Sequence, residues 1–199
     1  MKTPSLLLLG AALSLTATSC ADQPDVAPQP APAPAATFTL ARSFYYPGTT
    51  VFSGVSYPTA DVRAHGHQNP AGLHLQFVTH DRREGVYLTV DRSALGPDLL
   101  GTYALRSATN SRNPALAGYG YNYRVTDGGT AGSYYASSFS ELEGQVRISA
   151  YDAARHLISG SYEVRLPDVS DPTDSVRARA NQLRCRVTLG GSFANLRVE

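Results

Sequence analysis

The fold class of this chain is decided by the stretch from Val146 to Leu166, which reads Val146-Arg147-Ile148-Ser149-Ala150-Tyr151-Asp152-Ala153-Ala154-Arg155-His156-Leu157-Ile158-Ser159-Gly160-Ser161-Tyr162-Glu163-Val164-Arg165-Leu166. Apolar and polar side chains alternate on both sides of residues 152–156, and a period of two is typical of β-strands. We expect a hairpin whose apolar face consists of Val146, Ile148, Ala150, Ile158, Tyr162, Val164 and Leu166. If Ala150 pairs with Ile158, Gly160 lies opposite Ile148 and leaves room for that larger side chain.

A second hairpin is predicted upstream of the first. The apolar residues that alternate along its two strands are Leu73, Leu75 and Phe77, then Val86, Leu88 and Val90. Residues 81–85 join the two strands as a loop that ends on Gly85. Further strands are predicted at residues 38–42, 60–67, 102–106, 118–125, 133–138, 184–189 and 193–198.

These patterns predict an all-β fold. Many short strands separated by Gly, Pro, Asn and Asp are typical of an antiparallel β-sandwich or a flattened β-barrel. We expect at most one short helix, over residues 174–183, with Asp174 as its N-cap. Residues 37–199 suit a single domain that buries a substantial core, and they contain no internal repeat.

The first residues have the form of a targeting signal. Lys2 precedes an apolar stretch shorter than the roughly 20 residues of a membrane span, and small residues lead up to Cys20. We therefore expect residues 1–19 to be a lipoprotein signal peptide and Cys20 to be acylated, with palmitate or similar chains anchoring it in a lipid bilayer. The alternative is an ordinary secretory signal followed by a chance cysteine, because Ala17 stands where leucine is usual.

Residues 20–36 consist of the acylated cysteine and a linker rich in proline and alanine. Such a segment has too few apolar side chains to fold and favours an extended conformation. At about 3.1 Å per residue, it would hold the domain up to about 50 Å from the lipid anchor.

The charge balance argues against nucleic-acid binding. Lys2 is the only lysine, so removal of the leader takes the formal net charge from +1 to zero. Nucleic acids and anionic lipid surfaces both require clustered cations. We therefore expect no nucleic-acid partner and a mixed, solvated surface.

No common catalytic or cofactor motif appears in the domain, so we expect no cofactor and do not expect an enzyme. Every carboxylate is predicted on a solvent face or in a loop. Once Cys20 is acylated, Cys185 is the only free cysteine and no intramolecular disulfide can form. Because Cys185 alternates with Val187 and Leu189, we expect a buried thiol rather than a nucleophile.

Histidines point outward from two predicted strands. If Phe77 lies opposite Leu88, the strand pairing brings these histidines beside a carboxylate. The predicted row is His65, His67, His74 and Asp91. Imidazole and carboxylate groups are ligands for zinc or another divalent ion. The alternative is a polar sheet surface on which the histidines are incidental.

Tyrosines alternate with small residues in another predicted strand. Tyr119, Tyr121 and Tyr123 share one face, with Tyr134 and Tyr135 nearby in the sequence. Flat rings with a polar tip suit the recognition of a carbohydrate or a partner protein, so this stripe is a candidate ligand face. The alternative is that the rings cover the edge of a sheet.

Three acidic residues recur at every third position, Asp168, Asp171 and Asp174, in a loop that contains proline. Oxygen-rich loops bind calcium, but this one lacks the spacing and the glycine of a calcium loop. A solvated acidic turn is the preferred interpretation.

Three stretches near the C-terminus, 144–152, 158–162 and 187–195, follow the pattern G-x-V-x-I-S-x-Y-D, then I-S-G-x-F/Y, then G-x-F. This pattern resembles the C-terminal half of uncharacterised lipoproteins common in Bacteroidota, with Tyr162 where phenylalanine is commoner. The resemblance implies a hairpin followed by the final strands, and a place in the cell envelope at the outer membrane. It implies no chemistry.

Taken together, the sequence predicts a non-catalytic binding or accessory module of the cell envelope, whose partner is an envelope protein, a glycan or a small molecule. A calycin-like barrel that carries a small apolar ligand is the second hypothesis. An enzyme is the third, and it would need a cleft that gathers His, Asp and Arg from different strands.

Overall fold

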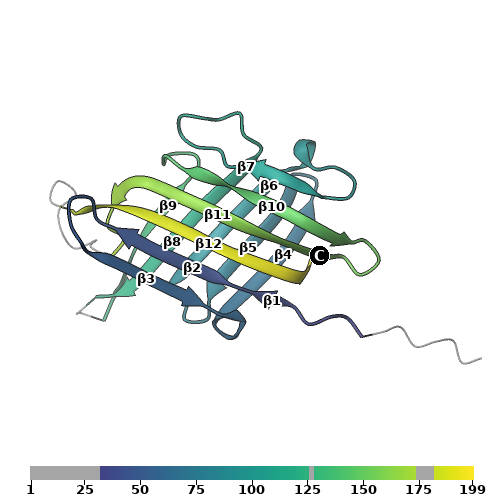
Figure 1. The fold of residues 1–199 in the computed structure, drawn as a ribbon, viewed down its shortest axis with the longest axis horizontal. Helices are drawn as coiled ribbons and strands as arrows, with labels where there is room; N and C mark the ends of the chain where they lie inside the picture. The colour runs from purple at the N-terminus through teal and green to yellow at the C-terminus, as the bar shows by residue number, and fades with distance from the viewer. Residues whose placement is uncertain (1–31, 126–127, 174–181) are drawn as a thin grey trace, which may run out of the picture. The chain divides into compact units, whose positions relative to one another are not determined.

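Two antiparallel β-sheets packed face to face form this domain, and their strands cross steeply (Figure 1). The computed structural model describes residues 32–125, 128–173 and 182–199. Within these ranges the only helical elements are two 3₁₀ turns, η1 (Thr59–Asp61) and η2 (Arg92–Ala94). The prediction of an all-β fold is therefore confirmed. Of the two predicted architectures the sandwich is correct, because the sheets pack on each other and do not close into a barrel.

The larger sheet has seven strands. Its order is β3-β2-β12-β11-β10-β7, and β1 also pairs with β12. The bounds are β1 Thr37–Phe38, β2 Leu40–Tyr45, β3 Phe52–Tyr57, β7 Gly101–Ala104, β10 Glu143–Asp152, β11 Leu157–Ser170 and β12 Arg184–Arg197.

The smaller sheet has five strands in the order β4-β5-β6-β8-β9. The bounds are β4 Val62–Asn69, β5 Gly72–Thr79, β6 Glu84–Asp91, β8 Ala115–Arg124 and β9 Thr130–Ala136. Both sheets lie in the unit formed by residues 33–199.

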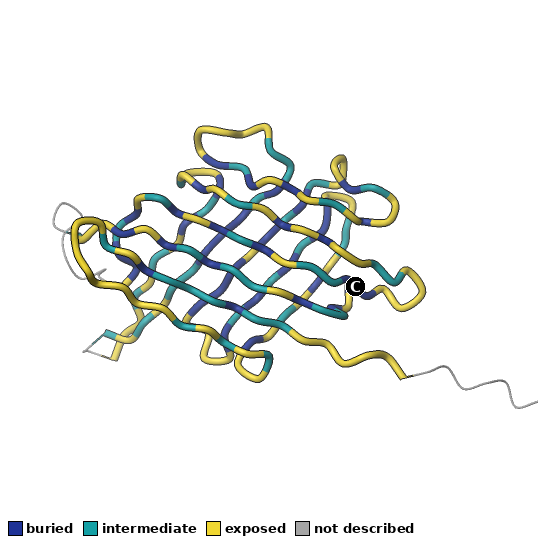
Figure 2. Tube along the Cα trace, viewed as in Figure 1, coloured by how far each residue is buried: buried dark blue, intermediate teal, exposed yellow. Residues whose placement is uncertain are grey.

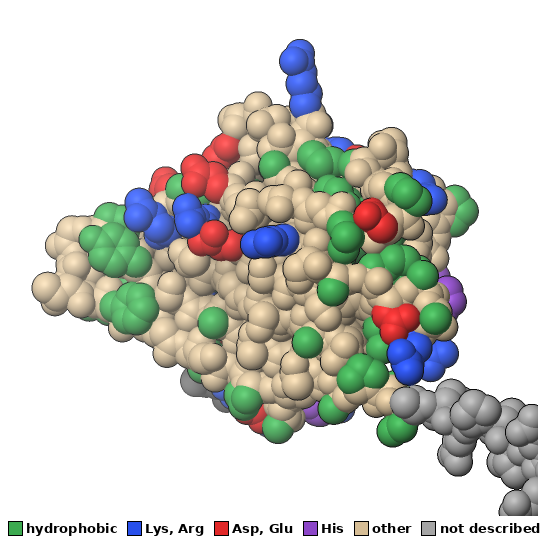
Figure 3. Space-filling view, turned by 45° about the vertical axis from the view of Figure 1, so that its right-hand side comes forward, with side chains coloured by type: hydrophobic (Ala, Val, Ile, Leu, Met, Phe, Trp, Pro, Cys, Tyr) green, Lys and Arg blue, Asp and Glu red, His purple; other side chains and the backbone are tan. Residues whose placement is uncertain are grey.

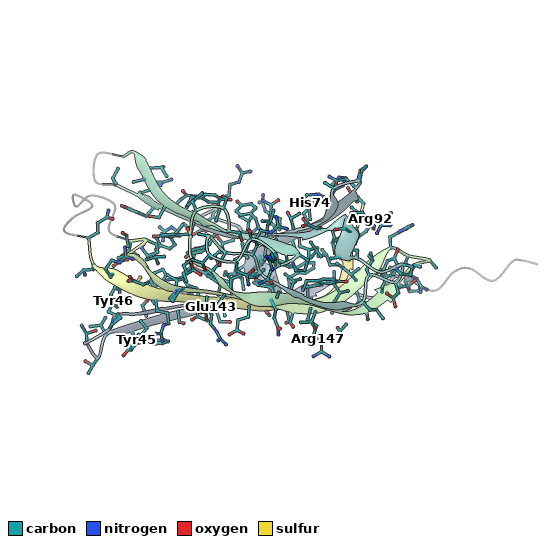
Figure 4. All side chains as sticks on the ribbon, turned by 90° about the horizontal axis from the view of Figure 1, so that it is seen from above. Tyr45, Tyr46, His74, Arg92, Glu143 and Arg147 are labelled. Atoms are coloured by element: carbon teal, nitrogen blue, oxygen red, sulfur yellow. The ribbon has the colours of Figure 1, made fainter. Side chains whose placement is uncertain are left out.

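The core lies between the two sheets. Alternate residues along each strand point inward, so buried and exposed positions alternate along the tube in Figure 2, and side chains fill the space between the layers in Figure 4. At the centre, the ring of Phe77 lies 4.7 Å from that of Tyr162 and 5.5 Å from that of Phe193. Aromatic contacts between the sheets therefore add to the burial of aliphatic side chains.

The hairpin of β10 and β11 confirms the first prediction in part. Ile148 lies opposite Gly160 as expected, but a bulge shifts the register, so Ala150 pairs with Ser159. The extra residue reverses the alternation, and Ala150 is exposed rather than on the apolar face. Gly160 is also needed for another reason: a Cβ there would lie 2.0 Å from the carbonyl oxygen of Arg147 and 2.7 Å from Cζ of Phe193.

Other boundaries differ from the prediction. The strands expected at 184–189 and 193–198 are one strand, β12, because Gly190 and Gly191 continue the pairing with β11. Strand β3 was not predicted. Of the helix expected at 174–183, only residues 182 and 183 are described, and neither is helical. The expected leader, Cys20 and most of the linker lie outside the described residues. No helix in the described part is both long enough and apolar enough to cross a bilayer.

Candidate functional site

The outer face of the five-stranded sheet carries two exposed tyrosines. Tyr87 of β6 points outward because Val86 and Leu88 on either side of it are buried in the core, and Tyr134 of β9 points outward because Tyr135 is buried. Their exposed fractions are 40% and 56%. Between β6 and β9 runs β8, which presents glycines on this face: Gly118 pairs with Tyr87, and Gly120 pairs with Tyr134.

Both rings lie against these glycines. A Cβ at Gly118 would be 2.5 Å from the hydroxyl oxygen of Tyr134 and 3.2 Å from its Cζ. A Cβ at Gly120 would be 3.7 Å from Cδ2 of Tyr134 and 4.0 Å from Cε2 of Tyr87. The ring of Tyr87 also covers Gly85, whose Cβ would be 3.1 Å from Cε2. A side chain at Gly118 or Gly85 would crowd these rings, whereas a Cβ at Gly120 would be in ordinary van der Waals contact with them. We call Tyr87, Gly118, Gly120 and Tyr134 the tyrosine platform.

Two shallow hollows flank the platform, and both tyrosines line each of them. The hollow of about 400 Å³ is completed by Gly120, Asn122, Gly132 and Ser133. The hollow of about 230 Å³ is completed by Thr89, Leu116, Ala117, Gly118, Ala136, Ser137 and Ser138. Neither lining contains a charged residue or a histidine.

A hollow of about 700 Å³ on the seven-stranded sheet differs in character. Its lining contains the charged residue Glu163 as well as the exposed ring of Phe52. Figure 3 likewise shows acidic and arginine side chains close together on the visible surface, with hydrophobic side chains in separate small spots. Within the hollows of the two tyrosines, by contrast, every side chain is neutral.

The predicted tyrosine stripe is on the opposite face of its strand. Tyr119 is fully buried in the core, and Tyr121 and Tyr123 are half-buried on the same inner face. The interpretation of Tyr119, Tyr121 and Tyr123 as an exposed ligand face was therefore wrong. Large aromatic rings gain most by facing the core, so the small residues between them form the outer face. The residue that could have identified the exposed aromatic face is Tyr87, because it alternates with the buried residues Val86 and Leu88 and therefore points outward.

A charged pair between the sheets was also missed. Arg42 of β2 lies with its Nε 3.0 Å from Oε1 of Glu84 of β6, and that oxygen also accepts a hydrogen bond of 3.0 Å from the hydroxyl of Tyr57. The guanidinium lies 4.1 Å from the ring centroid of Phe44 and 5.5 Å from that of Tyr121. Glu84 was expected in a hairpin loop. It is instead the first residue of β6, on the inner face with Val86.

Burial controls the ionisation of this pair. It raises the pKa of Glu84, and the nearby positive charge of Arg42 only partly opposes that effect. Burial is the largest single influence on Arg42 and acts to lower its pKa, but the negative charge of Glu84 and smaller effects of the neighbouring tyrosines together raise that pKa. Because the Glu84 side chain is only 1% exposed, the pair forms a polar link between the sheets rather than a site open to ligands.

The histidine row is not assembled. Phe77 pairs with Val86 rather than Leu88, so the strands are offset by two residues from the expected register. As a result Asp91 lies opposite Gly72 and forms an ion pair with Arg106.

On the other side of β5, His67 lies opposite His74, and His65 lies opposite Gln76. Figure 4 shows His74 on the outer side of its sheet. Its Nδ1 lies 3.0 Å from Oγ1 of Thr89, and its Nε2 lies 3.2 Å from Oδ1 of Asn69. Nowhere in residues 32–125, 128–173 and 182–199 do three His, Cys, Asp or Glu residues group as metal ligands would. The predicted metal site of His65, His67, His74 and Asp91 was thus based on the wrong pairings.

The predicted acidic loop is in part a strand, because Asp168 belongs to β11, and the two described carboxylates have partners within the protein. Asp168 pairs with Arg184 at 2.8 Å, and Asp171 accepts a hydrogen bond of 2.9 Å from the hydroxyl of Tyr46. Asp174 lies outside the described residues. The prediction for Cys185 is confirmed: the thiol is fully buried, and burial raises its pKa to about 12.

Comparisons of the chain with protein-family models, with curated proteins and with solved structures find no match. The candidate site is therefore assigned from the geometry of the tyrosine platform alone.

Proposed function

We propose that this protein is a lipid-anchored, non-catalytic binding module of the bacterial cell envelope, and that the tyrosine platform is its ligand-binding surface. The observation that carries the proposal is the pair of exposed rings resting on glycines. Exposed aromatic side chains held in one orientation provide contact area at a low cost in conformational entropy. The domain thus offers a preformed surface for a ligand.

The anchor is proposed from the sequence. Residues 1–19 have the form of a lipoprotein signal peptide, Cys20 is the proposed acylation site, and the linker up to residue 36 separates the domain from the bilayer. We propose the outer membrane as the location because the C-terminal sequence pattern resembles that of Bacteroidota lipoproteins. The domain would therefore bind its ligand in the cell envelope, at a distance from the bilayer that the linker allows.

The carrier hypothesis is weaker than the binding module. A calycin-like carrier holds its ligand inside a barrel, whereas the inner faces of these two sheets are occupied by buried side chains. An aromatic surface on the outside of a filled sandwich favours recognition of an external ligand.

The anchor is tested by metabolic labelling. Cells that express the full chain are grown with an alkyne-bearing fatty acid, and their inner and outer membranes are separated by density. We expect label on the protein, its enrichment in the outer membrane, and loss of both in Cys20→Ser. Cys185→Ser is the matched control and should keep its label. Label that persists in Cys20→Ser would contradict the proposal.

The binding role is tested with the acylated protein in liposomes. Delipidated envelope fragments are pelleted at low speed, and the liposomes that pellet with them are measured. We expect Tyr87→Ala and Tyr134→Ala to reduce this fraction. Tyr45→Ala is the control, because Tyr45 is similarly exposed, at 43%, on the other sheet. Equal retention of all four proteins would contradict the platform as the binding surface.

A further inference from the structure

We infer that the tyrosine platform binds a neutral polysaccharide built of β-1,4-linked hexopyranose units. The inference rests on the proposed function and names the chemical class of its ligand.

The first argument is the absence of charge. Both hollows beside the platform are lined by neutral side chains and backbone only. An acidic or basic ligand would be removed from water here without a counter-charge, which is unfavourable. The surface therefore complements a neutral molecule.

The second argument is shape. Tyr87 and Tyr134 lie against the sheet, are 40% and 56% exposed, and line two shallow hollows. A β-1,4-linked hexopyranose chain is extended and ribbon-like, and its sugar rings present flat patches of C–H groups. Such patches stack on aromatic faces. The exposed ring of Phe139, with its centroid 6.2 Å from that of Tyr134, lengthens the apolar surface.

The third argument is the polar rim. Asn122 lines one hollow, and Thr89 and Ser138 line the other. Hydroxyl and amide groups at these positions match the equatorial hydroxyls at the edges of a sugar chain. The Asn122 amide donates to the carbonyl oxygen of Arg82, and the Thr89 hydroxyl contacts Nδ1 of His74, so both side chains are held in place. Each still has hydrogen-bonding capacity for a sugar hydroxyl.

Shielding of glycine is a structural alternative for the same rings. Aromatic side chains that cover glycines on a neighbouring strand stabilise sheets. That role requires a ring over the backbone but needs neither a neutral lining nor a second ring across Gly120. The two roles are separated by measuring stability and binding on the same variants.

The experiment measures binding of cellohexaose to the acylated protein in detergent micelles by calorimetry, with maltohexaose as the α-linked contrast. We expect Tyr134→Ala and Tyr87→Ala each to weaken binding about tenfold, the loss expected for one stacked ring. Tyr134→Phe should stay within about threefold, because the ring remains. Tyr45→Ala, on the other sheet, should bind as the wild type does.

Gly118→Ala is the variant that best separates ligand binding from stability. Its new methyl group meets the hydroxyl end of Tyr134, so the ring must lift from the sheet, while the strand backbone can stay in place. We expect the unfolding midpoint to be retained and binding to fall about tenfold. Chemical denaturation of each variant separates lost binding from lost stability.

Each outcome supports or contradicts the inference. Cellohexaose bound more tightly than maltohexaose, with loss in the platform variants only, supports the inference. Absence of binding to both sugars overturns it. If envelope fragments still bind through Tyr87 and Tyr134, the proposed function survives that failure. If neither the binding of sugars nor the binding of envelope fragments depends on Tyr87 and Tyr134, both proposals are wrong.

Discussion

Arg42 and Glu84 approach to 3.0 Å between Nε and Oε1, although one belongs to the seven-stranded sheet and the other to the five-stranded sheet. Each occupies an inward position that the alternation reserves for an apolar residue. Arg42 lies between Leu40 and Phe44 on the inner face of β2. The two sheets are therefore joined by charge as well as by apolar packing.

We expect the two members of this pair to contribute unequally to stability. Arg42→Met should lower the free energy of unfolding by about 3 kcal/mol at neutral pH, because a buried carboxylate loses its counter-charge. Glu84→Gln should cost less than about 1 kcal/mol, because the raised pKa of Glu84 shows that burial opposes its charge more than Arg42 favours it. Urea unfolding monitored by tyrosine fluorescence measures both.

The control for this comparison is Arg184→Met. It breaks an exposed ion pair with Asp168, so its effect should stay below about 0.5 kcal/mol. If Glu84→Gln lowers the free energy of unfolding more than Arg42→Met does, burial does not oppose the charge of Glu84 more strongly than Arg42 favours it, and the prediction is wrong.

Stability should also depend on the protonation of Glu84. Because the folded state raises this pKa above its ordinary value of 4.5, the folded chain binds the proton more tightly than the unfolded chain. The contribution of Glu84 is therefore fully present below the ordinary pKa and is lost as the pH rises through the raised one. Unfolding free energies of the wild type should fall relative to those of Glu84→Gln as the pH rises from the ordinary pKa of 4.5 through the raised pKa of the folded state. Parallel curves would contradict the raised pKa.

Gly160 should tolerate no side chain. In Gly160→Ala the new Cβ would collide with the carbonyl of Arg147, a backbone atom that can move only with its strand. We expect a loss of about 2–3 kcal/mol in the free energy of unfolding. Gly190→Ala is the control, since its nearest contact is the carbonyl oxygen of Tyr162 at 3.6 Å. Similar effects of the two changes would show that crowding is not what requires Gly160.

The thiol of Cys185 should be unreactive in the folded protein. It is fully buried, and its pKa is raised to about 12, so little thiolate exists at neutral pH. Incubation with iodoacetamide followed by mass spectrometry should show no alkylation of Cys185 in buffer and complete alkylation in urea. Rapid labelling of the native protein would mean that the strands around it open readily.

Zinc should leave the stability unchanged. Both ring nitrogens of His74 already face neutral oxygen partners, and Asp91 pairs with Arg106. Differential scanning calorimetry with and without added zinc should therefore give the same unfolding midpoint. An unfolding midpoint that rises with zinc concentration would show that the folded protein binds zinc and would contradict this prediction.

The sequence was sufficient for properties that depend on neighbours along the chain. A period of two assigns each residue to one face of its strand, and polar turns separate the strands. For this reason the all-β fold, the existence of the hairpin of β10 and β11 and the buried position of Cys185 were predictable, whereas the choice between a sandwich and a barrel was not. The exposed position of Tyr87 between Val86 and Leu88 could have been predicted in the same way.

The tertiary structure alone decided which strands are neighbours and in what register. A shift of two residues preserves every face and changes every partner, so alternation could not choose between Asp91 and Thr89 as the partner of His74. Packing of one sheet on the other also decided which face of β8 is internal, and it buried Tyr119. Glycines were thereby left on the outer face, where Tyr87 and Tyr134 from two other strands cover them, and this arrangement arises only when three separate strands are brought together.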